Sequence, residues 1–123
     1  MSIDLLQVKG VKCSSIASGI KKNNILDLSL ISLSKGSSTA AVFTQNIFCA
    51  APVIVSKNHV NSNIEALLIN SGNANAGTGE RGLEDCYNTC VYLAEELEIK
   101  PEQVLPFSTG VIGAFLPLEA FKS

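Results

Sequence analysis

The chain has 123 residues, of which 46% are apolar and 16% charged. This composition excludes disorder and predicts one domain, residues 1–123, with a well-buried core. Its net charge is −2 and its lysines form no basic stripe, which argues against a nucleic-acid-binding surface. The longest apolar run, 47–55, is broken by Pro52 and is too short to span a membrane, and the N-terminus lacks a signal-peptide pattern. We therefore expect a cytoplasmic protein that contacts neither nucleic acid nor membrane.

The first part of the chain predicts short strands. A strand is possible over residues 16–22, and residues 26–33 alternate apolar and small polar side chains, as a half-buried strand does. The turn cluster 34–38 then predicts a hairpin with a further strand over 39–44. Beyond Pro52, the β-branched run 53–55 predicts one more strand.

The centre of the chain predicts a strand, a tight turn and a helix. Residues 67–70 are a short apolar run bounded by turn residues, which is typical of a buried strand, and residues 71–79 hold three glycines and small polar residues. The run 80–98 should be helical and end near Ile99, because Pro101 cannot continue it. Its apolar residues lie on one helix face: Leu83, Cys86, Tyr87, Cys90, Val91, Ala94 and Leu97.

After this helix we expect a short turn at 101–104, an extended segment at 105–107 and the beginning of a helix over 116–121. This order of elements predicts an α/β or α+β layered sandwich, in which one long helix covers one face of a mixed, mostly antiparallel sheet. A chain that stops soon after a helix begins is expected to be truncated.

The cysteines and the single histidine predict no metal site, because no two cysteines form a C-x-x-C pair and His59 lies far from all of them in the sequence. Cys86 and Cys90 share the apolar face of the helix, where cysteine serves as a small buried hydrophobe. His59 lies among polar residues in the predicted loop or single helical turn 56–63, and we expect it on the surface.

Two glycine-rich segments are candidate sites. Gly77–Gly82 matches the dinucleotide pattern G-x-G-x-x-G, but six residues separate it from the preceding strand, and Glu80, Glu84 and Asp85 crowd the helix N-terminus where a diphosphate would bind. The other segment, Ser108–Gly113, offers hydroxyls and flexible backbone at a strand end, where donors can face a reacting carbonyl oxygen. An ordinary turn would use the same residues.

Read together, several segments resemble the ornithine acetyltransferase family, the bifunctional glutamate N-acetyltransferases of arginine biosynthesis. The resemblance covers residues 8–121, in the family's order and spacing. The segments that carry it are Ala17–Lys21, Asp27–Ile31, Ala41–Thr44, Ala50–Val53, Asn70–Ala76, Thr78–Glu80, Gly82-Leu83, Ser108–Gly113 and Leu116-Pro117.

The resemblance implies the N-terminal half of an N-terminal-nucleophile-like acetyltransferase fold. In this family a precursor cuts itself before a Thr, which becomes the nucleophile of a β chain, while the upstream α chain remains associated, as a heterotetramer of two α and two β chains. The Thr takes acetyl from N-acetylornithine and passes it to glutamate. The family's oxyanion-hole residues carry over to the Thr109 hydroxyl and the Gly110 backbone N–H.

The resemblance implies neither cofactor nor metal, and it leaves open whether acetyl-CoA serves as a co-substrate. This chain stops before the Ala-Thr cleavage segment, so the isolated chain is expected to be inactive, and most substrate-binding residues would lie beyond its end. Two alternatives stay open: a truncated, catalytically inactive stand-alone domain of the same family, and a nucleotide-binding module at Gly77–Gly82.

Overall fold

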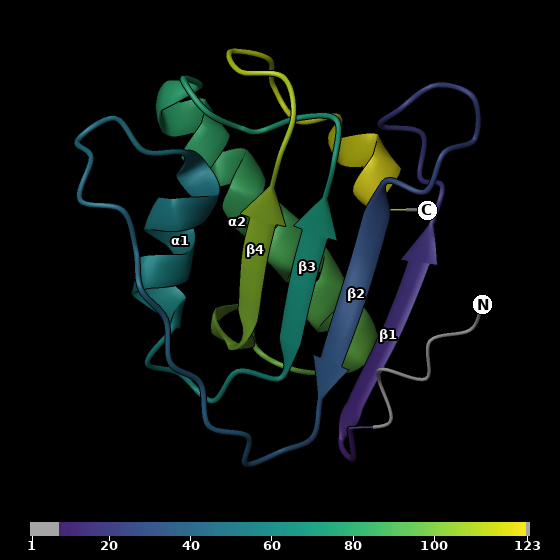
Figure 1. The fold of residues 1–123 in the computed structure, drawn as a ribbon, viewed down its shortest axis with the longest axis vertical. Coiled ribbons are helices and arrows are strands. Elements are labelled where there is room, and N and C mark those ends of the chain that lie inside the picture. Colours follow the sequence, from purple (N-terminus) through teal and green to yellow (C-terminus); the bar gives the residue numbers. More distant parts are fainter. Residues whose placement is uncertain (1–7, 123) are drawn as a thin grey trace.

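The computed structural model describes residues 8–122 and contains a four-stranded sheet in the order β1-β2-β3-β4 (Figure 1). The pairings β1–β2 and β2–β3 are antiparallel, and β3–β4 is parallel. The predicted α+β fold with a mixed, mostly antiparallel sheet is therefore confirmed. The elements are β1 (Val11–Ile16), β2 (Leu28–Leu33), α1 (Ala51–His59), β3 (Ala66–Asn70), α2 (Gly79–Leu97), η1 (Pro101–Gln103), β4 (Val104–Ser108) and η2 (Leu118–Phe121).

The long helix α2 packs behind the sheet and forms the main core with it (Figure 1). Cys86 and Cys90 are buried on its inner face, as predicted, and they pack with Leu68 of β3 and Val104 of β4. Burial raises the pKa of both thiols, to about 12 for Cys90, so they remain protonated and serve as core residues. Helix α2 ends at Glu98, which has a left-handed backbone (φ 55°).

The shorter helix α1 lies along the outer edge of β4 (Figure 1). Ser56 Oγ donates to the Pro106 carbonyl oxygen at 3.0 Å, and His59 Nδ1 donates to the Val104 carbonyl oxygen at 2.8 Å. Pro106 has no N–H to leave unpaired, so it suits an edge strand. The helix therefore satisfies the strand's outward carbonyls and blocks further strand pairing on that side.

The other face of the sheet is covered by no helix of residues 8–122. Side chains alternate along each strand, so every second residue of a strand points away from α2. The strand pairing brings these residues together on the second face. Most are half-buried or exposed apolar side chains, apart from the polar pair Ser15 and Ser29 and from Leu105, which is buried at 3% exposure. The set includes Ile31, Leu33, Leu67, Ile69, Leu105 and Phe107.

Several predictions for the first half of the chain are wrong. The β-branched run 53–55 is helical, within α1, because Pro52 occupies the first turn and the helix is anchored on β4. Residues 39–44 form no strand and no hairpin, because both edges of β2 are already paired with β1 and β3.

Residues 17–22 are also not a strand: β1 ends at Ile16, whose carbonyl oxygen accepts the Asp27 N–H and closes the following loop. His59 is buried, at 4% exposure, with its ring edge-on to Tyr87. The predicted strands at 26–33, 67–70 and 105–107 and the long helix are confirmed as β2, β3, β4 and α2. The last predicted helix is the short 3-10 turn η2.

Candidate functional site

The candidate site forms where the parallel strands β3 and β4 end side by side. Asn70 pairs in register with Ser108, the last residue of β4. The Ser108 hydroxyl donates to Asn70 Oδ1 at 2.6 Å, and the Thr109 N–H donates to the Asn70 carbonyl oxygen at 3.1 Å. Because the strands run parallel, the loops that follow them leave the sheet at the same edge. This edge brings together Asn70–Ala76 and Ser108–Gly113, two of the segments that carry the family resemblance.

The loop after β4, residues 109–115 and hereafter the donor loop, lies directly on the loop after β3. A Cβ atom on Gly110 would come within 2.3 Å of the Gly72 carbonyl carbon and 2.5 Å of the Asn73 nitrogen. Gly110 also has a φ of +129°, which disfavours any side chain. Only glycine fits this position, because both the space and the backbone angle exclude a Cβ atom.

The Gly110 N–H and the Thr109 hydroxyl have no hydrogen-bond partner within residues 8–122. The N–H groups on either side are bonded: Thr109 N–H to the Asn70 oxygen, and Val111 N–H to the Gly72 oxygen at 3.3 Å. Both Thr109 and Gly110 are exposed. Two unpaired donors on adjacent residues, held by a bonded backbone, are the arrangement that stabilises a carbonyl oxygen as it becomes an oxyanion.

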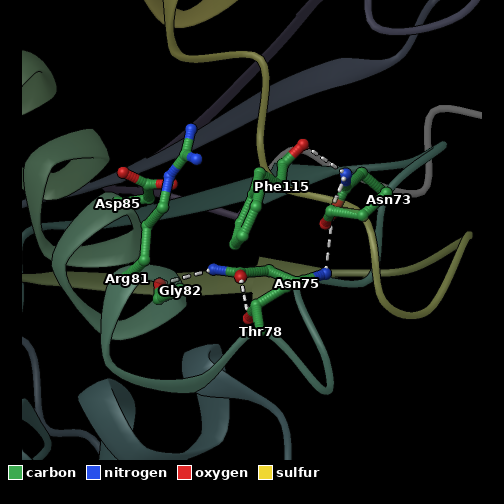
Figure 2. Close-up of polar contacts among 8 residues, drawn as sticks. Asn73, Asn75, Thr78, Arg81, Gly82, Asp85 and Phe115 are labelled. Atoms are coloured by element: carbon green, nitrogen blue, oxygen red, sulfur yellow. Dashed lines mark hydrogen bonds and ion pairs between the residues drawn. The ribbon is translucent and has the colours of Figure 1, made fainter.

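Three buried asparagines form a network around the loop after β3, and one of them, Asn73, bonds to the donor loop. Asn70 donates to the Asn73 carbonyl oxygen, and Asn73 Nδ2 donates to the carbonyl oxygens of Ala114 and Phe115 at 3.1 and 3.0 Å. Asn75 Nδ2 donates to the Gly82 carbonyl oxygen in the first turn of α2. Figure 2 shows Asn73 and Asn75 in this network. These asparagines lie in the Asn70–Ala76 segment, from which the sequence alone predicts no role for them.

A cation also contacts the donor loop. The Arg81 guanidinium lies over the Phe115 ring, 3.8 Å from its centroid, and Arg81 Nε lies 3.5 Å from Asp85 Oδ2 (Figure 2). Asp85 is buried at 7% exposure, whereas the Arg81 side chain is mostly exposed. The contact is a cation–π interaction that holds the Phe115 side chain against α2.

A third loop, residues 17–27, supports the site from the β2 side. The buried Asp27 carboxylate accepts hydrogen bonds from the Ser18 N–H, the Ser18 hydroxyl and the Lys21 N–H, at 2.7, 2.7 and 2.8 Å. Burial alone would raise the pKa of Asp27, but these hydrogen bonds outweigh burial and lower the pKa to about 2. The Asp27 carbonyl oxygen accepts the Ser71 N–H at 2.9 Å, which connects this loop to the one that contacts Gly110.

An open, mostly apolar groove of about 330 Å³ reaches the site along β4. Its walls come from residues 41–44, the start of α1 and β4, and Ser108 and Thr109 lie among the lining residues. The volume falls in the range of small-molecule sites. Thr109 therefore borders a groove of the size that binds small molecules.

The other glycine-rich segment, Gly77–Gly82, does not form a phosphate cradle. The Thr78 hydroxyl donates to Asn75 Oδ1, and a Cβ on Gly82 would overlap Thr78, so these residues pack on one another. Eight residues, 71–78, separate β3 from α2, whereas a dinucleotide site turns directly from strand to helix. Within residues 8–122 no three potential ligands gather to hold a metal ion, and no helix has the length and apolarity to cross a membrane.

Comparisons with known proteins agree with this geometry. A sequence model of the ArgJ family matches residues 12–123. The arginine biosynthesis bifunctional protein ArgJ of Methylococcus capsulatus is 46% identical over 121 residues, and that of Colwellia psychrerythraea is 45% identical over 127 residues. These alignments cover 98% and 94% of this chain but only 30% of each relative, so the chain spans less than a third of the length of these relatives.

Two solved structures share the fold. The crystal structure of ArgJ from Bacillus halodurans is 40% identical with a TM-score of 0.86, and the alignment covers 93% of this chain and 60% of that chain. Ornithine acetyltransferase from Mycobacterium tuberculosis, solved with ornithine bound, is 33% identical with a TM-score of 0.83, covering 93% of this chain and 63% of that one.

Proposed function

Since the chain belongs to the ArgJ family, we propose that it is the α-chain portion of a glutamate N-acetyltransferase that moves acetyl from N-acetylornithine to glutamate in the cytoplasm. The observation that carries this proposal is the pair of unpartnered donors, the Thr109 hydroxyl and the Gly110 N–H, on a loop with a bonded backbone. We assign these two donors to the oxyanion hole. The nucleophile is the N-terminal Thr of a β chain.

The proposed chemistry is a covalent relay in two halves. The Thr oxygen attacks the acetyl carbonyl carbon of N-acetylornithine, the C–N bond breaks, and ornithine leaves with the proton on its amine. The glutamate amine then attacks the acetyl ester, the C–O bond breaks, and the Thr hydroxyl regains a proton as N-acetylglutamate leaves. Each half passes through a tetrahedral oxyanion, to which Thr109 and Gly110 would donate.

Two further observations support a partner chain. The alignments cover 60% of the Bacillus halodurans crystal chain but only 30% of the curated relatives, so that crystal chain is about half as long as they are. Such a difference is expected if the precursor is cut in two. The uncovered apolar face of the sheet gives the β chain a surface on which to pack. We expect two α and two β chains to assemble, with no cofactor in the transfer.

The test begins with purification from the native cell and intact-mass measurement. A second chain that begins with Thr should accompany this one, and the complex should convert N-acetylornithine and glutamate to ornithine and N-acetylglutamate. Assay with acetyl-CoA and glutamate alone decides whether acetyl-CoA is a second donor. A 13.0 kDa chain recovered alone, without acetyl transfer, would instead establish the inactive stand-alone domain.

Variants of Thr109 test the assignment of the donors. Removing one oxyanion donor typically lowers kcat by about 100- to 1000-fold, which is the expected effect of Thr109→Ala in the assembled enzyme. Thr109→Ser keeps a hydroxyl and should retain most of the activity. If both variants kept the wild-type kcat, Thr109 would not be an oxyanion donor.

A further inference from the structure

Asn73 contacts both ends of the donor loop. Its backbone nitrogen lies against Gly110, and its side-chain amide donates to the carbonyl oxygens of Ala114 and Phe115. Two backbone hydrogen bonds on either side of Asn73 also reach Val111 in the middle of the loop. The Val111 N–H donates to the Gly72 oxygen, and the Ala74 N–H donates to the Val111 oxygen. No other side chain in residues 8–122 forms hydrogen bonds to the 114–115 end of the loop.

The donor loop depends on such a contact because its backbone hydrogen bonds to the 70–78 segment end at Gly113. Val111 and Ile112 are 60% and 68% exposed, and Gly110 and Gly113 both have positive φ angles. Glycines of this kind allow many backbone conformations in the absence of tertiary contacts. The last backbone hydrogen bond to the 70–78 segment is the one from the Gly113 N–H to the Ala76 oxygen. Beyond Gly113, the Asn73 amide holds the backbone of the loop, and the exposed Arg81 contacts only the ring of Phe115.

The Asn73 amide is fully used in this arrangement. Both N–H bonds of Nδ2 are donated to the loop, and Oδ1 accepts the Asn75 N–H at 2.8 Å. The residue is 5% exposed, so its own amide group is largely shielded from water. A side chain that can both donate twice and accept once is needed, and at this length only asparagine provides it.

We propose that Asn73 is a positioning residue for the oxyanion donors, which it keeps aligned by closing the donor loop from Gly110 to Phe115. The role rests on the proposed acetyltransferase function. Asn73 does not touch the reacting atoms, so it acts only through Thr109 and Gly110. Misplacing catalytic groups by about 1 Å can cost up to a hundredfold in rate, so the expected loss of kcat is roughly 10- to 100-fold.

The test compares Asn73→Asp with Asn75→Asp in the enzyme purified with its partner chain. Both changes replace one buried amide of the same motif by a carboxyl group, but the Asn75 side chain bonds to Thr78 and Gly82, away from the donor loop. In Asn73→Asp we expect a lower kcat with an unchanged KM, at temperatures where both variants are fully folded. Its kcat should recover as the pH is lowered, because a protonated carboxyl group can donate to one of the two carbonyls.

Hydrogen exchange gives a readout that does not depend on activity. The hydrogen-bonded amides of Thr109, Val111 and Gly113 should exchange about tenfold or more faster in Asn73→Asp than in Asn75→Asp, since local opening sets their protection. If the Asp variant does not fold, Asn73→Ser removes the long amide without adding a charge and is measured in the same way. Equal exchange and equal kcat in the Asn73 and Asn75 variants would overturn the positioning role, whereas an inactive wild-type complex would overturn the proposed function.

Discussion

Gly110 lies against Gly72 so closely that a Cβ atom on Gly110 would come within 2.3 Å of the Gly72 carbonyl carbon. The contact joins the loops that follow two parallel strands, and it sets the position of the free Gly110 N–H. A methyl group at residue 110 would therefore separate the two loops and move one of the assigned oxyanion donors. The effect of that change on stability can be compared with its effect on catalysis.

We expect Gly110→Ala to destabilise the chain by ~1–3 kcal/mol, because a strained backbone angle and a steric clash act together. Acetyl transfer should fall by a larger factor than the folded fraction does. Urea unfolding of the purified protein measures the first effect and kcat the second. Gly113→Ala is the matched control: its φ is +83°, but an added Cβ would meet nothing within 4 Å. It should cost only about 1 kcal/mol.

His59 anchors helix α1 on the edge of β4, so its loss should be felt throughout the fold. In His59→Ala the Val104 carbonyl oxygen would keep only the weak contact from Cys90 Sγ at 3.9 Å, and a cavity would open beside Tyr87. We expect a loss of about 2–4 kcal/mol in the free energy of unfolding. His59→Asn retains a donor near the position of Nδ1 and should recover part of this loss. Equal stability of the two variants would show that the hydrogen bond to Val104 contributes nothing.

Asp27 should make the fold sensitive to acid. Its carboxyl pKa is lowered to about 2 in the folded protein, from 3.8 without these contacts, so its charged form stabilises the fold. This contribution is complete above about pH 4 and is lost as the pH falls toward 2. The stability difference between wild type and Asp27→Asn, measured by urea unfolding, should shrink over this window. A difference that stayed constant from pH 5 to pH 2 would contradict the assigned hydrogen bonds.

The four cysteines should differ in their reactivity. Cys86 and Cys90 are buried and their thiol pKa values are raised, Cys49 is partly buried, and Cys13 is exposed. Because the thiolate is the reactive form, iodoacetamide at neutral pH should modify Cys13 first and leave Cys86 and Cys90 intact. Intact mass and peptide mapping measure the sites of modification. In urea all four should react; rapid modification of Cys90 in the folded chain would contradict its position in the core.

The sequence predicted the elements whose pattern is local. The helical spacing from Leu83 to Leu97 indicated α2, and the apolar run at 67–70 indicated β3. Helix α1 could not be found in this way, because Val53-Ile54-Val55 has the composition of a strand. It is helical because of contacts with Val104 and Pro106, about fifty residues away in the sequence.

The candidate site, too, could be predicted from local sequence only in part. Glycine and hydroxyl residues at a strand end suggested donors, and the resemblance to a family selected Thr109 and Gly110 among them. The sequence alone could not show how the donors are held. Asn73 bonds to Ala114 and Phe115, which follow it by 41 and 42 positions in the chain. Such pairs become visible only when the parallel strands lie side by side.

The parallel pairing of β3 with β4 also has a consequence for biosynthesis. Antiparallel neighbours can be joined by a short turn, but here the whole crossover of residues 71–103, including α2, must be made before β4 can dock. Residues 70–78 therefore leave the ribosome well before residues 109–115, the donor loop that they hold in place. A domain that folds as a unit during translation cannot align Thr109 and Gly110 until that later segment has emerged. The two assigned donors can therefore take up their positions only after residues 109–115 have left the ribosome.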